Sequence, residues 1–186
     1  MPDFALNRRA VLAAGVGLAA ASVATLSLPG TGQAATLDSA LQTALKGQRV
    51  LRDPVTDAAF DGRPVLVTFF ASWCPPCRAE MGHLQSYIDK HGDTVSMIAV
   101  NWMEDFAGPI DTARLNRFLD VVPASMPVIQ ADGRLTQAMG GVLSVPAVFI
   151  FDGQGQEVFT LGGGQGQIGR YFITEDQLTT VIAGLS

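Results

Sequence analysis

Runs of apolar residues alternate with amphipathic stretches along this chain, and the alternation predicts strands followed by helices. Residues 64–71 and 94–102 are rich in β-branched and aromatic residues, as buried strands are. Each run is followed by apolar positions spaced three to four residues apart, which predicts helices in 75–92 and 111–122. The first helix opens with prolines and the second with a capping aspartate, so both starts are well marked.

Shorter elements complete the pattern. They are a helix in 37–46, a strand in 126–133, a brief helix in 134–139, two strands around a glycine-rich turn in 145–163, and a last helix in 174–185. Strands that alternate with helices predict an α/β domain whose central sheet is covered by helices on both faces.

A glycine-rich segment, GGGQGQIG, has the spacing of a dinucleotide-binding loop at Gly164, Gly166 and Gly169. Such a loop must lie between the first strand and helix of a βαβ unit, with an acidic residue about 20 positions further on. This segment instead follows a predicted strand pair near the end of the chain. We therefore expect a connector and not a cofactor site.

The N-terminal residues follow a different pattern. Two adjacent arginines in NRRAVL precede an uncharged run over residues 10–28, and small residues follow at 32–34. A basic start, an apolar middle and a small-residue end are typical of an export signal, and paired arginines favour the twin-arginine route. The run is dominated by alanine and glycine, so an uncleaved membrane anchor is the weaker alternative. We expect residues 1–34 to be a signal peptide cleaved near Ala34, and 35–186 to form one domain.

The charge balance restricts the partners. The chain has 12 basic and 17 acidic residues, a net charge of −5. The predicted signal holds two of the basic residues and one of the acidic ones, which leaves the domain with a net charge of −6. An acidic domain is poorly suited to nucleic acid or to an anionic membrane, and we expect neither as a partner.

The chain's only two cysteines lie in FFASWCPPCRAEM, residues 69–81. The pattern puts Cys74 where a strand turns into a helix, close to unpaired backbone N–H groups and the positive end of the helix dipole. Both favour the thiolate, which is the attacking species. Cys77, one turn along, can then attack the resulting mixed disulfide. A C-x-x-C beside a βαβ pattern therefore predicts a redox pair.

Two other uses of the cysteines are weaker. A disulfide that closes a two-residue loop removes little chain entropy, so a structural role would contribute little stability. Zinc needs four ligands, and His83 and His91 are the only histidines. Binding of copper(I) by Cys74 and Cys77 alone stays open as an alternative. We expect no metal and no cofactor other than the redox-active disulfide.

The two prolines between the cysteines bear on the direction of electron flow. Pro75 and Pro76 carry no N–H, so two possible donors to a Cys74 thiolate are missing. Strong oxidants depend on a heavily stabilised thiolate in their reduced form. The motif thus favours a reductase, with an oxidant that installs disulfides as the alternative.

VTFFASWCPPCRAEM, followed about 70 residues later by SVPAVFIFDGQGQEV, resembles the thioredoxin superfamily. More narrowly it is similar to exported thiol–disulfide oxidoreductases of the TlpA, ResA and cytochrome c maturation type. The resemblance implies a thioredoxin fold with a central mixed β-sheet, a periplasmic monomer, protein disulfide substrates and a membrane-embedded electron donor. Apocytochrome c or copper-site proteins are the clients that it implies.

The resemblance also implies roles for single residues. Cys74 matches the attacking cysteine and Cys77 the resolving one, and Pro146 matches a cis-proline preceded by Val145. The residues expected to meet the substrate are Trp73, Pro75, Pro76, Val145 and Pro146.

Glu80 matches an acidic residue that family members place close to the cysteines. Its carboxylate can shuttle a proton and raise the pKa of the pair, although a solvated glutamate on the helix surface is the alternative. Two positions depart from the family. Thr68 replaces the buried aspartate of thioredoxins proper and cannot serve as a proton acceptor. Gly82 replaces a helix-kinking proline of many relatives, so we expect the kink to be weaker or absent.

Overall fold

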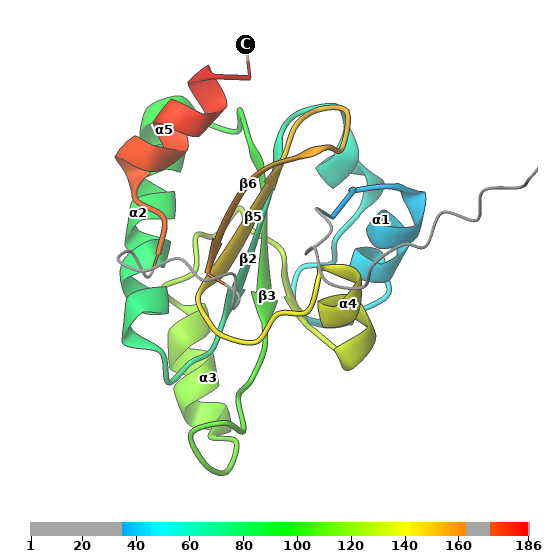
Figure 1. The fold of residues 1–186 in the computed structure, drawn as a ribbon. Helices are drawn as coiled ribbons and strands as arrows, with labels where there is room; N and C mark the ends of the chain where they lie inside the picture. The colour runs from blue at the N-terminus through cyan, green and yellow to red at the C-terminus, as the bar shows by residue number, and fades with distance from the viewer. Residues whose placement is uncertain (1–34, 163–171, 186) are drawn as a thin grey trace, which may run out of the picture. The chain divides into compact units, whose positions relative to one another are not determined.

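Six strands form one mixed sheet in the order β1-β4-β3-β2-β5-β6. Strands β3, β2, β5 and β6 are labelled in Figure 1. The strands are β1 Arg49–Arg52, β2 Val65–Phe70, β3 Ser96–Asn101, β4 Val128–Gln130, β5 Ala147–Phe151 and β6 Glu157–Gly162. Strands β2, β3 and β4 run parallel, whereas β1, β5 and β6 each pair antiparallel with their neighbours. The predicted central mixed sheet is confirmed.

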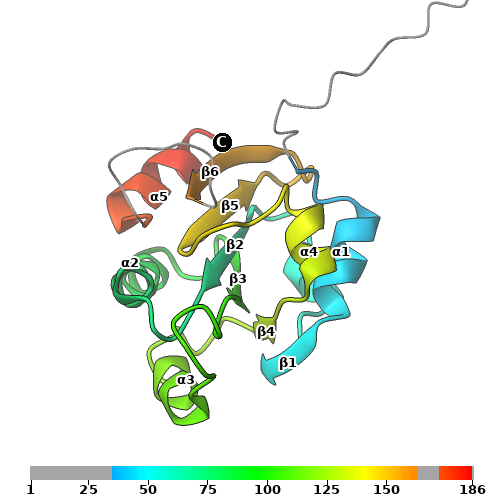
Figure 2. The ribbon, with the colours of Figure 1, turned by 60° about the horizontal axis from the view of Figure 1, so that its bottom comes forward.

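The helices divide between the two faces of the sheet. They are α1 Ser39–Lys46, α2 Pro75–His91, α3 Thr112–Leu119, α4 Gly133–Ala138 and α5 Glu175–Ala183, with a 3-10 turn at Asp57–Phe60. In two views α2, α3 and α5 lie on one side of the sheet, and α1 and α4 lie on the other (Figure 2). The prediction that helices cover both faces is thus confirmed.

This description comes from a computed structural model and covers residues 35–162 and 172–185, all within the unit 32–186. The predicted export signal at 1–34 and the glycine motif at 164–169 lie outside the described residues. Within the described part of the chain, no helix combines the length and the apolar character needed to cross a bilayer.

Strand β2 supplies both halves of the core. Successive strand residues point to opposite faces. Leu66 and Phe70 accordingly belong to the apolar cluster that includes the buried residues of α2, and Val67 and Phe69 belong to the cluster under α1 and α4. Thr68 has the same parity as Leu66, so this polar side chain faces α2.

Caps fix the ends of the helices that the sequence predicted. Helix α2 begins after its N-cap, Cys74, passes through Gly82 without a break and ends at Gly92, which has a φ of 66°. Helix α5 begins with a capping box in which Thr174 and Gln177 satisfy each other's backbone amides.

Candidate active site

The end of β2 delivers the cysteines to the first turn of α2. Cys74 is the N-cap residue and is disulfide-bonded to Cys77, with their Cα atoms 5.3 Å apart. The Cys77 backbone N–H donates a 3.2 Å hydrogen bond to the Cys74 sulfur. Pro75 and Pro76 occupy the first two helical positions, so this amide is the first one in the helix that can reach the sulfur. Cys74 is 3% exposed and Cys77 is 0% exposed, so of the two residues only Cys74 reaches the surface.

The Val145–Pro146 loop lies beside the start of this helix. Phe69 pairs with Ala147 in the antiparallel β2–β5 ladder, so Pro146 comes next to the last residue of β2. The Val145–Pro146 peptide bond is cis, as the resemblance implied. Pro146 is buried and Val145 is half-buried. The structure therefore brings this loop and the cysteine pair to the same end of the sheet.

A glycine that the sequence analysis did not single out supports the loop. Gly162, the last residue of β6, pairs with Ala147 and has a φ of +77°. A Cβ atom at this position would lie 2.2 Å from the carbonyl oxygen of Pro146, far inside van der Waals contact. The cis-proline loop thus packs on a site that only glycine fits.

Trp73 flanks the disulfide and is fixed on two sides. Its indole N–H donates a 2.7 Å hydrogen bond to the carbonyl of Met103, and its ring stacks on Phe106 at a centroid distance of 5.4 Å. Pro75, the other predicted contact residue on this side, is exposed, and Pro76 is half-buried.

Glu80 is fully buried, which makes the solvated-helix interpretation wrong. The Thr68 hydroxyl donates to its Oε1, and the backbone N–H of Ile173 donates to its Oε2 at 3.1 Å. Burial raises the pKa of Glu80 from 4.5 to about 7, and the two hydrogen bonds offset part of that rise. A carboxyl group that titrates near neutral pH therefore lies one helical turn beyond Cys77.

A second buried carboxylate, missed by the sequence analysis, holds the segment before Cys74. Glu104 accepts hydrogen bonds from the Ser72 N–H at 2.6 Å, the Ser72 hydroxyl at 2.7 Å and the Asn101 amide at 2.6 Å. Arg114 donates from Nε to the Ser72 hydroxyl at 3.0 Å. The contact between Ser72 and Glu104 could have been partly anticipated, because these residues follow adjacent parallel strands, and the ends of such strands meet at one edge of a sheet.

Trp102 connects two loops of this edge. Its backbone N–H donates to Phe70 at 2.8 Å, and its indole N–H donates to the Val142 carbonyl at 3.2 Å. The loop after β3 is thereby tied both to the end of β2 and to the loop that leads into Pro146.

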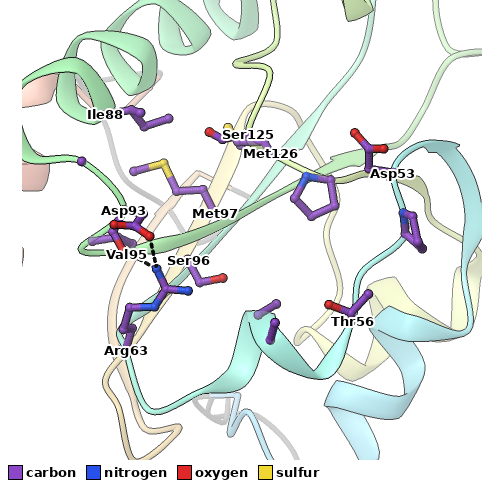
Figure 3. Close-up of a pocket in the computed structure, with 15 residues that line it drawn as sticks. Asp53, Thr56, Arg63, Ile88, Asp93, Val95, Ser96, Met97, Ser125 and Met126 are labelled. Atoms are coloured by element: carbon purple, nitrogen blue, oxygen red, sulfur yellow. Dashed lines mark hydrogen bonds and ion pairs between the residues drawn. The ribbon is translucent and has the colours of Figure 1, made fainter.

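A cavity of about 490 Å³ lies away from the cysteine pair (Figure 3). Its lining includes Ser96 and Met97 at the start of β3, and Arg63, whose guanidinium is 3.4 Å from Asp93. The cysteines follow the opposite end of the parallel strands. This cavity is therefore separate from the redox pair.

Known proteins with similar sequences carry names from disulfide chemistry. The chain is 32% identical over 131 residues to the thiol:disulfide interchange protein HelX of Rhodobacter capsulatus, a match that covers 69% of this chain and 65% of that protein. It is 33% identical over 108 residues to the thiol:disulfide interchange protein DsbE of Allochromatium vinosum, covering 56% of each. The chain thus spans between half and two thirds of the length of these relatives.

Solved structures show the same fold. A secreted disulfide oxidoreductase of Mycobacterium tuberculosis, homologous to Escherichia coli DsbE, matches with a TM-score of 0.57 and 19% identity over 77% of this chain and 98% of that one. A thioredoxin family thiol:disulfide interchange protein of Chlorobium tepidum matches with a TM-score of 0.56 and 18% identity, over 74% and 96% of the two chains. The predicted thioredoxin fold is confirmed.

The Redoxin family model matches residues 38–167. That stretch is more than half of the chain and includes both cysteines, Glu80 and the Val145–Pro146 loop. The chain belongs to the Redoxin family.

Proposed function

We propose that this chain is an exported thiol–disulfide oxidoreductase that reduces disulfides in protein substrates. The observation that carries the proposal is the Cys74–Cys77 disulfide at the N-terminus of α2, beside the cis Val145–Pro146 loop. A buried titratable carboxyl group on the same helix adds the means to move a proton.

Two exchange steps account for the reaction. The Cys74 thiolate attacks one sulfur of the substrate disulfide, and the other substrate sulfur leaves as a thiolate that takes a proton from solvent. The Cys77 thiol then loses its proton to the Glu80 carboxylate and attacks the Cys74 sulfur. The second substrate thiolate leaves, so the substrate gains two electrons and the enzyme is left with the Cys74–Cys77 disulfide. The greater exposure of Cys74 supports its role as the attacking residue.

Two features support the reducing direction. The Cys74 sulfur accepts a hydrogen bond from the third helical residue, Cys77, while the first two helical positions lack N–H groups. The ionised form of Glu80 adds a negative charge on the same helix, which disfavours a second anion there. The two missing N–H donors and the Glu80 charge leave the Cys74 thiolate less stabilised than the thiolate of a strong oxidant. The reduced dithiol is then less favoured, and the pair gives up its electrons more readily.

The compartment and the partners rest on sequence features and relatives. The N-terminal pattern supports export to the periplasm, and one structural neighbour is a secreted protein. In that setting a membrane-embedded donor regenerates the dithiol, and apocytochrome c or copper-site proteins are the clients. The chain acts as a monomer with no cofactor beyond its redox-active disulfide.

The reduction potential of the Cys74–Cys77 pair tests the direction. Equilibration in defined thiol buffers, followed by alkylation and mass analysis, places the pair on a scale from about −270 mV for thioredoxin to about −120 mV for a strong oxidant. A value near the lower end supports the reductase. A value near the upper end would make the chain a disulfide donor. The Cys74→Ser variant, which cannot form the disulfide, gives the background of the assay.

A further inference from the structure

Exposed apolar side chains gather at the end of the sheet that holds the disulfide. Among the described residues, the large apolar side chains that are exposed are Val50, Phe106, Ile110, Leu143 and Val158. Val50 and Val158 lie on the two edge strands, β1 and β6. The other three lie in the loop between β3 and α3 and in the loop that leads into β5, which both face the viewer in Figure 2 together with the start of α2.

Phe106 is held in place although its side chain is 71% exposed. Its ring stacks on Trp73, and its backbone N–H donates to the Met103 carbonyl at 3.2 Å, the same carbonyl that accepts the Trp73 indole. The neighbouring Glu104 is tied to Ser72. An aromatic ring is thus preorganised in solvent, next to the residue that precedes Cys74. Exposed apolar surface of this kind marks interaction sites.

Leu143 presents a second apolar side chain from the cis-proline loop. It is 75% exposed and lies three residues before Pro146. The preceding carbonyl, that of Val142, accepts the Trp102 indole, so the loop is anchored directly beside the exposed side chain. Phe106 and Leu143 therefore come from two anchored loops that both border the disulfide.

Acidic side chains accompany this apolar surface. Asp105 adjoins Phe106, Asp111 adjoins Ile110, and both carboxylates are exposed. Neither belongs to an ion pair within the described parts of the chain. Hydrogen bonding to the backbone N–H of Arg114 lowers the pKa of Asp111, which keeps it charged. The charges of Arg114 and Arg117 act on Asp111 and offset part of its negative charge. Asp105, next to Phe106, is therefore the carboxylate that most favours a basic partner.

We propose that Phe106 and Leu143 form a docking surface for an extended, basic client segment that carries an apolar side chain beside its cysteine. The proposal rests on the proposed function and names the class of substrate. The apolar neighbour of the client cysteine packs on the Phe106 ring or on Leu143, while Asp105 and Asp111 attract lysine or arginine further along the segment. Docking in this way brings the client disulfide to the Cys74 sulfur.

Two disulfide-linked peptides test the proposal. One is the dimer of Lys-Phe-Cys-Phe-Lys and the other is the dimer of Lys-Ser-Cys-Ser-Lys, which differ only beside the cysteine. Stopped-flow tryptophan fluorescence gives the rate constant at which the reduced protein reacts with each. We expect the phenylalanine peptide to react about tenfold faster, the effect of one good apolar contact.

Serine variants then locate the contact. Phe106→Ser and Leu143→Ser each lower the ratio of the two rate constants to about 3 or less. Val50→Ser and Val158→Ser remove exposed apolar side chains on the edge strands and leave the ratio unchanged. Because both rate constants come from the same preparation, partial unfolding of a variant cancels in the ratio.

The outcomes separate this proposal from the proposed function. Equal rates for the two peptides, or a ratio that neither Phe106→Ser nor Leu143→Ser lowers, overturns the docking surface and leaves the reductase standing. Failure of the reduced wild-type protein to react with either peptide overturns the reductase, and the docking surface with it.

Discussion

Glu80 of α2 and Thr68 of β2 share a buried hydrogen bond, so the carboxyl group on this side of the sheet is carried by the helix and not by the strand. The strand position was expected to lack a proton acceptor, since threonine replaces the aspartate of thioredoxins proper. The hydroxyl instead serves as a donor that holds Glu80. A titratable carboxyl group is therefore present on this side of the sheet, but it is attached to helix α2 instead of strand β2.

Stability should fall as Glu80 ionises. Burial raises its pKa from 4.5 to about 7, so between these values the folded protein binds more protons than the unfolded chain. The free energy of unfolding therefore decreases with rising pH across this window, by about 3 kcal/mol from this group. Urea unfolding of the oxidised protein at pH 5, 6, 7 and 8 measures the effect.

The Glu80→Gln variant should lose this pH dependence, because an amide does not titrate. Asp89→Asn, which changes an exposed acid on the same helix, should keep it. Parallel pH curves for the wild-type protein and Glu80→Gln would rule out Glu80 as the source.

The same carboxyl group should control release of the substrate. If it accepts the Cys77 proton, the decay of the mixed disulfide speeds up as pH rises through about 7, the pKa of Glu80. We expect Glu80→Gln to slow this decay by about 100-fold at pH 7.5 and to remove the step in its pH profile. Acid quenching and mass analysis of the mixed disulfide measure the rate. Decay that is equally fast in Glu80→Gln contradicts the role.

The sequence predicted the elements that carry periodic apolar positions. Helix α2 and strand β2 were expected within a residue or two of their bounds, since buried apolar residues recur along one side of each. Strand β1, Arg49–Arg52, was missed because its two apolar residues are adjacent and flanked by arginines, and all four are exposed or half-buried. An edge strand without a buried face leaves little pattern to detect.

The site was predictable where a motif carries the chemistry and less so where tertiary contacts do. The cysteines, Trp73 and Pro146 stand in recognisable motifs. The burial of Glu80 depends on Thr68 and on Ile173, which is 93 residues away in sequence. Glu104 depends in the same way on a parallel strand that brings Ser72 beside it. No local pattern reports such contacts.

Removal of the Glu104 carboxylate should destabilise the folded protein. Glu104→Ala leaves the buried Ser72 N–H and hydroxyl without their acceptor. It also removes the shorter of the two hydrogen bonds that the Asn101 amide donates. Each unsatisfied buried group costs about 1–3 kcal/mol, so we expect a loss of about 3 kcal/mol in urea unfolding. Glu157→Ala, at a half-buried position on β6, provides a carboxylate deletion away from the disulfide. A loss below about 1 kcal/mol for Glu104→Ala would mean that water replaces the carboxylate.

Two glycine-to-alanine changes should have opposite effects. At Gly162 the new Cβ would meet the Pro146 carbonyl at 2.2 Å with a φ of +77°, so the cis-proline loop must move, and we expect a loss of about 2 kcal/mol or more. At Gly82 the Cβ meets nothing within 4 Å and the backbone is helical, so alanine should stabilise by about 0.5–1 kcal/mol. Thermal unfolding measures the stability of both variants, and the rate of peptide reduction by Gly162→Ala measures the effect of moving the cis-proline loop. Unchanged stability in Gly162→Ala would contradict the close packing of β6 on this loop.

The two prolines of the motif should differ in their effect on the Cys74 thiol. An N-cap side chain accepts from the amide of the second or third helical residue, and here only the third, that of Cys77, has an N–H. Pro76→Ala restores an amide at the second position, which should stabilise the thiolate and lower the pKa of Cys74 by about one pH unit. Pro75→Ala restores an amide at the first position, which N-cap side chains do not normally reach, and serves as the matched control. Thiolate absorbance as a function of pH in the reduced proteins measures both values. A pKa that falls equally in the two variants would show that helix flexibility, and not the missing amide, governs the thiol.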